Sequence, residues 1–578
     1  MPASDLNLPI TQTDAFKKRL AKRNRADQRF RLYGIGAVLI ALGLLVTLIS
    51  SIVIEARSAF TRHELSLELE LTQTDSLSVY QSIRNATGEL AGDAADENVQ
   101  IDIARLVSRL AAGPITEALH ENGADLSRRY PVEVTLSDEA DRYLKGLVSP
   151  VGRFDLGEFE QIGDELTGDF SASLALVRNA FRTQIEQIRH DELRSAERMQ
   201  AGLERQVVNA PGDRQLILRA DGAASRVNSI VARVSALEAR LNATVIDLDD
   251  SAPGILIRTD EGWFKVVRIT EESVQVESLL SGLEQSSLTG QLLVVERPLD
   301  HRSISDAQIA AVEELSARGL IHSRFNTSLF SQSDSSDPEF AGVLSGLIGS
   351  VMIVLVTMML AVPVGIAAAV YLEEFAPRNR VTSFIQININ NLAAIPSIVF
   401  GLLGAAIFVN GVIIPLPFFD GVFRIGGGLG RGWPLVGGIV LALMTLPTII
   451  IASRAALGAV PRSVRQAALA MGATRLQTTN HHVLPMAAPG ILTGSIIGLA
   501  QAIGETAPLL LIGMVAFVGE LPQGMSDRAT ALPVLIFQWS TRAERAWEPM
   551  TSAAIIILLL VMLALNGLAV LMRLRYEK

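Results

Sequence analysis

Apolar runs long enough to cross a bilayer restrict this chain to a membrane fold. A bilayer core of about 30 Å takes roughly 20 apolar residues of helix. Six runs meet or approach that length, and they are Tyr33–Ile54, Val343–Tyr371, Asn391–Val412, Pro434–Ile451, Pro489–Val518 and Met550–Leu571. Because charged residues still make up 19% of the chain, we expect a protein divided between membrane and water.

Basic residues collect at one set of ends of these runs and so predict their orientation. The basic segment 1–32 precedes the first transmembrane helix 33–54, whose apolar region is too long for a signal peptide. The arginine-rich segment 454–485 and the tail 573–578 fall on the same side. The positive-inside rule therefore predicts that both termini are cytoplasmic and that residues 60–341 are periplasmic.

Residues 60–325 contain no membrane-length apolar run and predict an inserted extracytoplasmic α+β domain. Between about 170 and 248 the apolar residues recur at helical spacing, and after Pro253 they alternate as in strands. The helical stretch is either a partner-binding coiled coil or an amphipathic helix packed in its own domain, and its lack of sustained heptads favours the second. A polar linker is predicted at 326–341.

Composition and missing motifs exclude several functions. A net charge of −10 argues against nucleic-acid binding. The absence of cysteine excludes disulfides, thiolate metal sites and thiol catalysis. No lysine follows a glycine, so the chain has no Walker A loop and is not expected to hydrolyse ATP by that route. No cofactor is expected on this chain.

The segment Arg465–Gly490 carries an ordered set of residues between two apolar runs. Gln466-Ala467-Ala468 is followed after three residues by Gly472, after nine more by His482, and after one more by Leu484-Pro485. Gly472 predicts either a turn between two short helices or a place where another backbone comes close. His481 and His482 are adjacent, so on a helix they point about 100° apart and do not predict a shared metal ion.

This spacing resembles the EAA loop of ABC importer permeases, with Gln466 in place of the family's Glu and His482 in place of its Ile. Three further stretches look like signatures of the phosphate-specific permeases of the PstA type. They are VPVGIAAAVYLEEFAP (362–377), NNLAAIPSIVFGLLG (390–404) and GETAPLLLIG (504–513). The resemblance implies an all-α polytopic membrane domain of the type I permease fold, with six transmembrane helices, five of them in residues 342–572.

The resemblance also implies a function and a set of partners. The chain would be a non-catalytic permease subunit in the inner membrane that forms half of a phosphate path and couples through loop 454–485 to an ABC ATPase dimer. ATP and Mg would bind to that dimer. Its other partners would be a second related permease, an extracytoplasmic phosphate-binding protein and membrane lipid, with no nucleic acid. The two permeases would form a heterodimer in preference to a homodimer. The extra domain 60–325 is expected to dock the binding protein or the partner permease.

Two alternatives stay open. Within the same class, the substrate could be another oxyanion, sulfate or molybdate. In another class, the chain could be a membrane receptor with a large extracytoplasmic sensor domain, although this does not explain five spans after the domain or the loop spacing.

A few polar residues near or within predicted spans are candidates for the translocation path. Glu505 would be costly inside a membrane, and Gln501 lies four residues earlier, on the same face of the predicted helix. A carboxylate repels phosphate, so Glu505 is expected to position an arginine. Many family members carry arginine at the position of Gln501, and some at that of Ile451. Arg454, nearly one turn later, is either the substitute candidate or only a positive-inside anchor. Asn391 completes the set.

Overall fold

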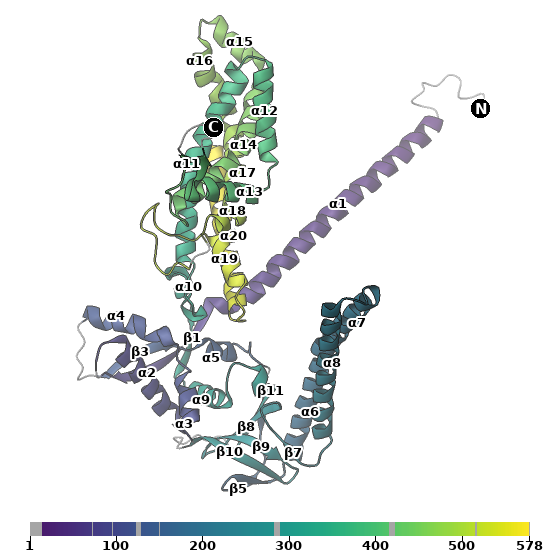
Figure 1. Ribbon diagram of the computed structural model, residues 1–578, viewed down its shortest axis with the longest axis vertical. Coiled ribbons are helices and arrows are strands. Elements are labelled where there is room, and N and C mark those ends of the chain that lie inside the picture. The colour runs from purple at the N-terminus through teal and green to yellow at the C-terminus, as the bar shows by residue number, and fades with distance from the viewer. Residues whose placement is uncertain are drawn as a thin grey trace. The chain divides into compact units, whose positions relative to one another are not determined.

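The computed structural model describes residues 14–71, 73–94, 96–122, 129–149, 151–281, 290–415, 422–514 and 517–576. The chain divides into two compact units, both visible in Figure 1. The helical unit comprises Met1–Phe60, Ser331–Asp334 and Gly342–Lys578, and the αβ unit comprises Thr61–Phe330 and Ser335–Ala341. The first 13 residues of the predicted segment 1–32 and the last two of the tail 573–578 lie outside the described residues.

The part of the αβ unit that the structure describes forms two antiparallel sheets. The smaller has the order β12 (Ile321–Phe325), β1 (Thr61–Glu70), β3 (Arg129–Thr135). The larger has the order β4-β11-β8-β9-β10-β6-β5, with β2 and β7 attached beside β10 and β9. Its strands are β2 (Asp93–Ala94), β4 (Val151–Asp155), β5 (Phe159–Ile162), β6 (Glu165–Gly168), β7 (Ile246–Asp247), β8 (Pro253–Arg258), β9 (Gly262–Ile269), β10 (Ser273–Ser281) and β11 (Gln291–Pro298).

One hydrophobic core joins the two sheets through the helices between them. On β1 every second residue, Leu65, Leu67 and Leu69, is buried, because side chains alternate between the faces of a strand. These leucines pack in one cluster with Trp263 of the larger sheet and with five helices. The helices are α2 (Ser76–Ala91), α3 (Glu97–Ala104), α4 (Ala112–Asn122), α5 (Asp138–Leu144) and α9 (Asp306–Ala317).

A long helical hairpin leaves the other face of the larger sheet. It runs through α6 (Ser171–Gln187), a π-helical turn at Ile188–Leu193 and α7 (Arg194–Asn209), and returns as α8 (Arg214–Leu241) (Figure 1). Its base is part of a second core, in which Phe181 of α6 and Leu237 of α8 are buried against the sheet. The helices therefore pack in their own unit at the base, whereas α7 and the start of α8 project beyond it.

Among its described residues, the helical unit has five helices that are long and apolar enough to span a membrane, or six if one bent pair counts as a span. The five are α1 (Asp14–Ala56), α11 (Leu344–Val370), α14 (Pro434–Ala459), α17 (Leu484–Gly504) and α20 (Trp547–Tyr576). Helix α14 packs along both α11 and α17, and α20 packs along α1 and α17. Helix α1 begins well before the predicted first residue, Tyr33, so the apolar run is the C-terminal part of a longer helix.

Two predicted spans are wrong as continuous helices. The span Asn391–Val412 is broken into α12 (Arg380–Ala393) and α13 (Ser397–Gly404), and the pair is bent by 98°. Pro396 explains the break, because proline disfavours helical backbone at the residue before it. The span Pro489–Val518 is replaced by α17, which starts earlier at Leu484 and stops at Gly504, and by the short helix α18 (Ala507–Leu511).

Candidate functional site

The polar segment between α14 and α17 folds into two short helices joined by a tight turn. The first is α15 (Arg462–Ala470), which follows Pro461, and the second is α16 (Arg475–Thr478). Thr474 and Gln477 form a reciprocal capping box at the start of α16, with bonds of 3.3 and 2.9 Å. A π-helical turn, Thr479–Val483, leads directly into α17. We keep the name EAA-like loop for residues 454–485.

The turn predicted at Gly472 is present and has the geometry of a Schellman C-cap. The Ala473 N–H donates to the Ala468 carbonyl at 3.1 Å, and the Gly472 N–H donates to the Leu469 carbonyl at 3.0 Å. Gly472 has φ +90°, a conformation that side chains with a Cβ rarely adopt. Nothing lies within 4 Å of a Cβ built there, so the backbone conformation, and not crowding, requires glycine.

Arg465 links this loop to the ends of two membrane-length helices by hydrogen bonds. Its Nη2 and Nε donate to Glu374 Oε1 at 2.6 and 3.1 Å, and Nε also lies 3.2 Å from Oε2. The same guanidinium donates to the carbonyls of Val460 and Leu457 at 2.7 and 2.8 Å. Glu374 lies in the π-helical turn Tyr371–Phe375 that ends α11. One side chain thus joins α15 to the ends of α11 and α14.

A second pair lies beside the first. Arg454 Nη2 is 3.5 Å from Glu373 Oε2, which joins α14 to the same turn at the end of α11. The two pairs together are called the EE–RR clasp (Glu373, Glu374, Arg454 and Arg465). Sequence reasoning missed the clasp, although both glutamates lie in a stretch that carries the family resemblance, because nothing in one sequence pairs residues 91 positions apart. Arg454, a candidate for the path, therefore has a carboxylate partner inside the chain.

The outer surface of the loop is apolar at several points. Gln466 and Ala467 are exposed, whereas Ala468 is buried. Around the turn, exposed apolar side chains gather, and they are Leu469, Met471 and Leu476. Met471 leaves 88% of its surface exposed, which is unusual for so large an apolar side chain.

The remaining motif residues lie where the loop joins α17. His482 is exposed in the π-helical turn, and Leu484 and Pro485 form the first turn of α17. His481 Nδ1 lies 3.1 Å from the Gln477 carbonyl. Buried apolar side chains behind this junction, such as Val483 and Leu457, hold the loop against the ends of α11, α14 and α17.

The structure separates the path candidates. Gln501 lies on α17 and its Oε1 accepts a 3.4 Å hydrogen bond from Thr448 of α14. Glu505 is not on that helix: it follows Gly504 with extended backbone, φ −80° and ψ 118°, in the break before α18. Glu505 is the C-cap residue of α17, with its N–H bonded to the Ala502 carbonyl, and Gly504 and Pro508 lie on either side of the break between α17 and α18. Asn391 is exposed near the end of α12.

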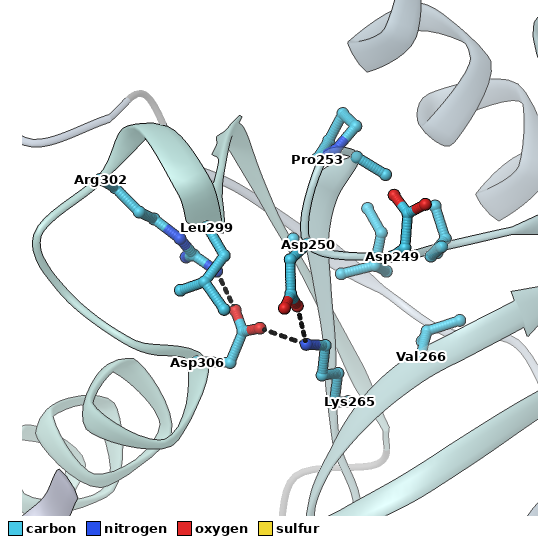
Figure 2. A pocket seen from close by; sticks show the side chains of 12 residues that line it. Asp249, Asp250, Pro253, Lys265, Val266, Leu299, Arg302 and Asp306 are labelled. Atoms are coloured by element: carbon cyan, nitrogen blue, oxygen red, sulfur yellow. Dashed lines mark hydrogen bonds and ion pairs between the residues drawn. The ribbon is translucent and has the colours of Figure 1, made fainter. Parts of the chain in front are cut away.

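A charged pocket in the αβ unit is occupied by its own ion pairs (Figure 2). Lys265 Nζ lies 3.1 Å from both Asp250 Oδ1 and Asp306 Oδ2, and Arg302 also pairs with Asp306. Burial lowers the pKa of the Lys265 ammonium, but its pairs with Asp306 and Asp250 outweigh that effect and raise the pKa above its ordinary value. These ion pairs link Lys265 of β9 to Asp306 at the start of α9 and to Asp250 in the turn before β8.

Comparison with known families assigns most of the helical unit to a transport family and gives no function for the αβ unit. Residues 361–578 match the family described as the binding-protein-dependent transport system inner membrane component. Residues 17–151 match a domain of unknown function, DUF3333.

Individual relatives match the same part of the chain. A probable ABC transporter permease, YqgH of Bacillus subtilis, is 32% identical over 228 residues, which cover 39% of this chain and 69% of that protein. The phosphate transport system permease protein PstA of Haemophilus influenzae is 30% identical and covers 41% and 78%. PstA 1 of Mycobacterium tuberculosis strain CDC 1551 is 32% identical and covers 41% and 72%. A solved structure of the MetNI methionine ABC transporter covers 41% of this chain at 16% identity and a TM-score of 0.31.

Proposed function

Because this chain belongs to the ABC importer permeases of the PstA type, we propose that it forms half of a path for inorganic phosphate and is driven through the EAA-like loop. Permease subunits of this family are multi-pass inner-membrane proteins without catalytic activity. The ATPase activity of the importer resides on partner subunits, and a substrate-binding protein completes it. In this account ATP and Mg bind to the partner ATPase dimer, and this chain carries no cofactor.

The EAA-like loop is the proposed docking site for the ATPase. Its exposed Leu469, Met471 and Leu476 supply an apolar surface that a partner groove would bury. The EE–RR clasp supports the proposal: Arg465 connects the docking helix α15 to the ends of α11 and α14 by hydrogen bonds, and the Arg454–Glu373 ion pair connects α14 to the end of α11. A movement of the loop would then be carried into the membrane helices rather than absorbed by a flexible connection.

Phosphate is the proposed substrate because two of the relatives are phosphate transport permeases. Gln501 and Ile451 stand where family members carry arginine, so anion recognition in this chain would rest on other donors. Gln501 presents an amide that can donate, and its bond to Thr448 uses only its carbonyl oxygen. Glu505, in the break between α17 and α18, is proposed to orient an arginine of the partner permease.

The assembly and its orientation are further parts of the proposal. The amino and carboxyl ends are placed in the cytoplasm, with the αβ unit on the extracytoplasmic side. The second half of the path would be a related permease in a heterodimer, and a phosphate-binding protein would deliver the anion. This arrangement places the ATPase and the binding protein on opposite faces of the membrane, as ATP-driven import requires.

Reconstitution of this chain with its partner permease, ATPase and binding protein tests the substrate. We expect phosphate to stimulate ATP hydrolysis in proteoliposomes, and sulfate and molybdate to leave it at the basal rate. If sulfate or molybdate stimulates hydrolysis and phosphate does not, the substrate is that other oxyanion, and the chain is still an ABC importer permease. A failure of the chain to bind any ATPase through residues 454–485 would overturn the coupling role.

A further inference from the structure

A short piece of the chain that precedes α11 packs on the helical unit. Ser331–Asp334 belongs to the helical unit, whereas the residues on either side of it belong to the αβ unit. The Gly342 N–H donates to the Ser333 carbonyl at 2.8 Å, and the Leu344 N–H donates to the Gln332 carbonyl at 3.2 Å. These bonds hold this piece, which we call the strap, against the first residues of α11.

The strap ends in a buried carboxylate. Asp334 leaves 2% of its side chain exposed. Its Oδ1 accepts a hydrogen bond from the Trp539 indole at 2.9 Å, and its Oδ2 lies 3.6 Å from Arg542 Nη2. A buried carboxylate destabilises a fold unless hydrogen bonds and an opposite charge offset its lost hydration. Asp334 therefore fixes the strap to the segment that carries Trp539 and Arg542.

Two tryptophans complete this contact, one in α19 (Leu532–Ser540) and one at the start of α20. Trp539 and Trp547 are each 1% exposed, and their ring centres lie 5.4 Å apart. The Arg542 guanidinium lies over the Trp547 ring, 3.8 Å from its centre, which is close enough for a cation–π interaction. Because Arg542 faces both the Asp334 carboxylate and this ring, it joins the strap to α20. We call these four residues the tryptophan corner.

Helix α19 also packs closely on the first half of α11. The Leu532 N–H donates to Ser350 Oγ at 2.8 Å. A Cβ added to Gly349 would lie 2.0 Å from the Thr530 carbonyl oxygen, so the backbone of α11 touches the chain that leads into α19. The strap and α19 therefore hold the start of α11, and the EE–RR clasp holds its end. A helix of 27 residues is about 40 Å long, so these contacts are far apart.

We propose that α11 transmits movement between the EAA-like loop and the tryptophan corner, with Asp334 as the positioning residue that makes α11 and α20 move together. The inference rests on the proposed function, in which an ATPase drives the chain through the EAA-like loop. A rigid helix that is held at both ends carries a shift of the clasp to the corner. Without the Asp334 contact, the start of α11 moves while α20 stays behind.

The first test uses the importer reconstituted with its partner permease, ATPase and binding protein, and measures ATP hydrolysis with and without phosphate-loaded binding protein. D334N keeps an acceptor for the Trp539 indole but removes the charge that faces Arg542. We expect it to lower the stimulation by loaded binding protein about fivefold, with basal hydrolysis and assembly unchanged. R542A should act likewise, and the double variant should lose no more than either single one, because both changes break the same contact. E548Q, which removes an exposed acid from the first turn of α20, is the matched control and should keep the full stimulation.

A fluorophore beside the corner gives a second test that leaves Asp334 intact. The chain contains no cysteine, so S540C, at the exposed end of α19, carries a single label attached before assembly. We expect a non-hydrolysable ATP analogue on the partner ATPase to shift the emission of this label. R465A, which breaks the clasp at the other end of α11, should remove that shift.

Three results would overturn the inference. They are full stimulation in D334N, a label at position 540 that does not respond to the nucleotide in the intact importer, and a response that persists in R465A. If loaded binding protein fails to stimulate hydrolysis in the unmodified importer, the proposed function fails instead.

Discussion

The guanidinium of Arg465 donates to both carboxylate oxygens of Glu374 and, at the same time, to two backbone carbonyls at the end of α14. Arg465 directly precedes the Gln466-Ala467-Ala468 element of the EAA-like loop. The contact is partly buried, with 21% of the Arg465 side chain and 11% of that of Glu374 exposed. The proposed docking surface and the end of α11 are therefore linked through the contact between Arg465 and Glu374.

Breaking this contact should uncouple the importer. We expect E374Q or R465A to lower ATP-driven transport by about tenfold, within the range of typical coupling free energies, while the chain stays in the membrane and still binds the ATPase. The exchange E374R with R465E should recover part of the loss, because the pair is restored with reversed charge. Transport in proteoliposomes, divided by ATP hydrolysed, is the measurement.

R462A is the matched control for that experiment. Arg462 lies one turn earlier on α15 and is exposed, with no ion pair among the described residues. Its replacement should leave the ratio of transport to hydrolysis unchanged. If R462A and R465A behave alike, the effect belongs to the net charge of the loop, and the clasp has no specific role.

Gly472 should tolerate only residues that accept left-handed backbone. With φ +90°, replacement by leucine imposes a strain of roughly 1 kcal/mol or more on the turn between α15 and α16. G472L is expected to reduce phosphate uptake without loss of the protein from the membrane, and G472N to be milder, since asparagine visits this conformation more readily. Full uptake by G472L would show that this turn does not set the position of the docking surface.

The αβ unit should lose stability as the pH rises. Burial raises the pKa of Asp138 to about 7, with Arg142 opposing and Glu339 adding to the effect. Burial also raises the pKa of Glu339 to about 7, against a hydrogen bond from Ser108. Both carboxyls keep their protons longer in the folded than in the unfolded state, so stability falls from about pH 4 to about pH 7 and is level above that.

Removal of the two titratable carboxyls should remove this dependence of stability on pH. For D138N with E339Q we expect the free energy of unfolding of the αβ unit to vary less between about pH 4 and pH 7, since each unit of pKa shift is worth about 1.4 kcal/mol. The rate of proteolysis of the αβ unit in the full chain, measured across that pH range, reports this free energy of unfolding. E271Q, at an exposed turn, should retain the slope, and an unchanged slope in the double variant would contradict the assignment.

Glu314 should be the most costly single charge to remove from the αβ unit. Its carboxylate pairs with Arg258 at 2.9 Å and Arg318 at 2.9 Å, and it accepts from the Trp263 indole at 3.2 Å, with 1% of its side chain exposed. E314Q leaves two arginines without their shared acid, and a cost of about 3–5 kcal/mol is expected. Thermal unfolding followed by Trp263 fluorescence, in a chain whose other tryptophans are replaced, measures it.

Part of the fold can be predicted from local patterns in the sequence. Helical apolar runs of sufficient length predict α1, α11, α14 and α20, and Gly472 predicts its turn, because these features depend on neighbouring residues only. The break after Ala393 is not predicted, although Pro396 lies close to it, whereas Gly504 and Pro508 flank Glu505 and indicate the break that follows α17. Hydropathy averages over such positions, since the residues on each side are equally apolar.

Long-range pairing accounts for what sequence reasoning missed. The motif of the EAA-like loop is visible as a spacing, but the partner of Arg465 lies 91 residues away, and both are charges in cytoplasmic segments of the predicted topology. Sequence spacing predicts a helical Glu505 because Gln501 lies four positions before it. Glu505 lies at the break between α17 and α18, where Gly504 ends one helix and Pro508 lies in the first turn of the next.

Uptake of labelled phosphate into proteoliposomes tests the central claim most directly. The vesicles contain this chain, its partner permease and the ATPase, with the binding protein on one side and ATP on the other. We expect phosphate to accumulate against its gradient only when ATP and the binding protein are both present, and accumulation to fall by about tenfold with R465A. Accumulation of no oxyanion, with the ATPase bound and active, would contradict the account.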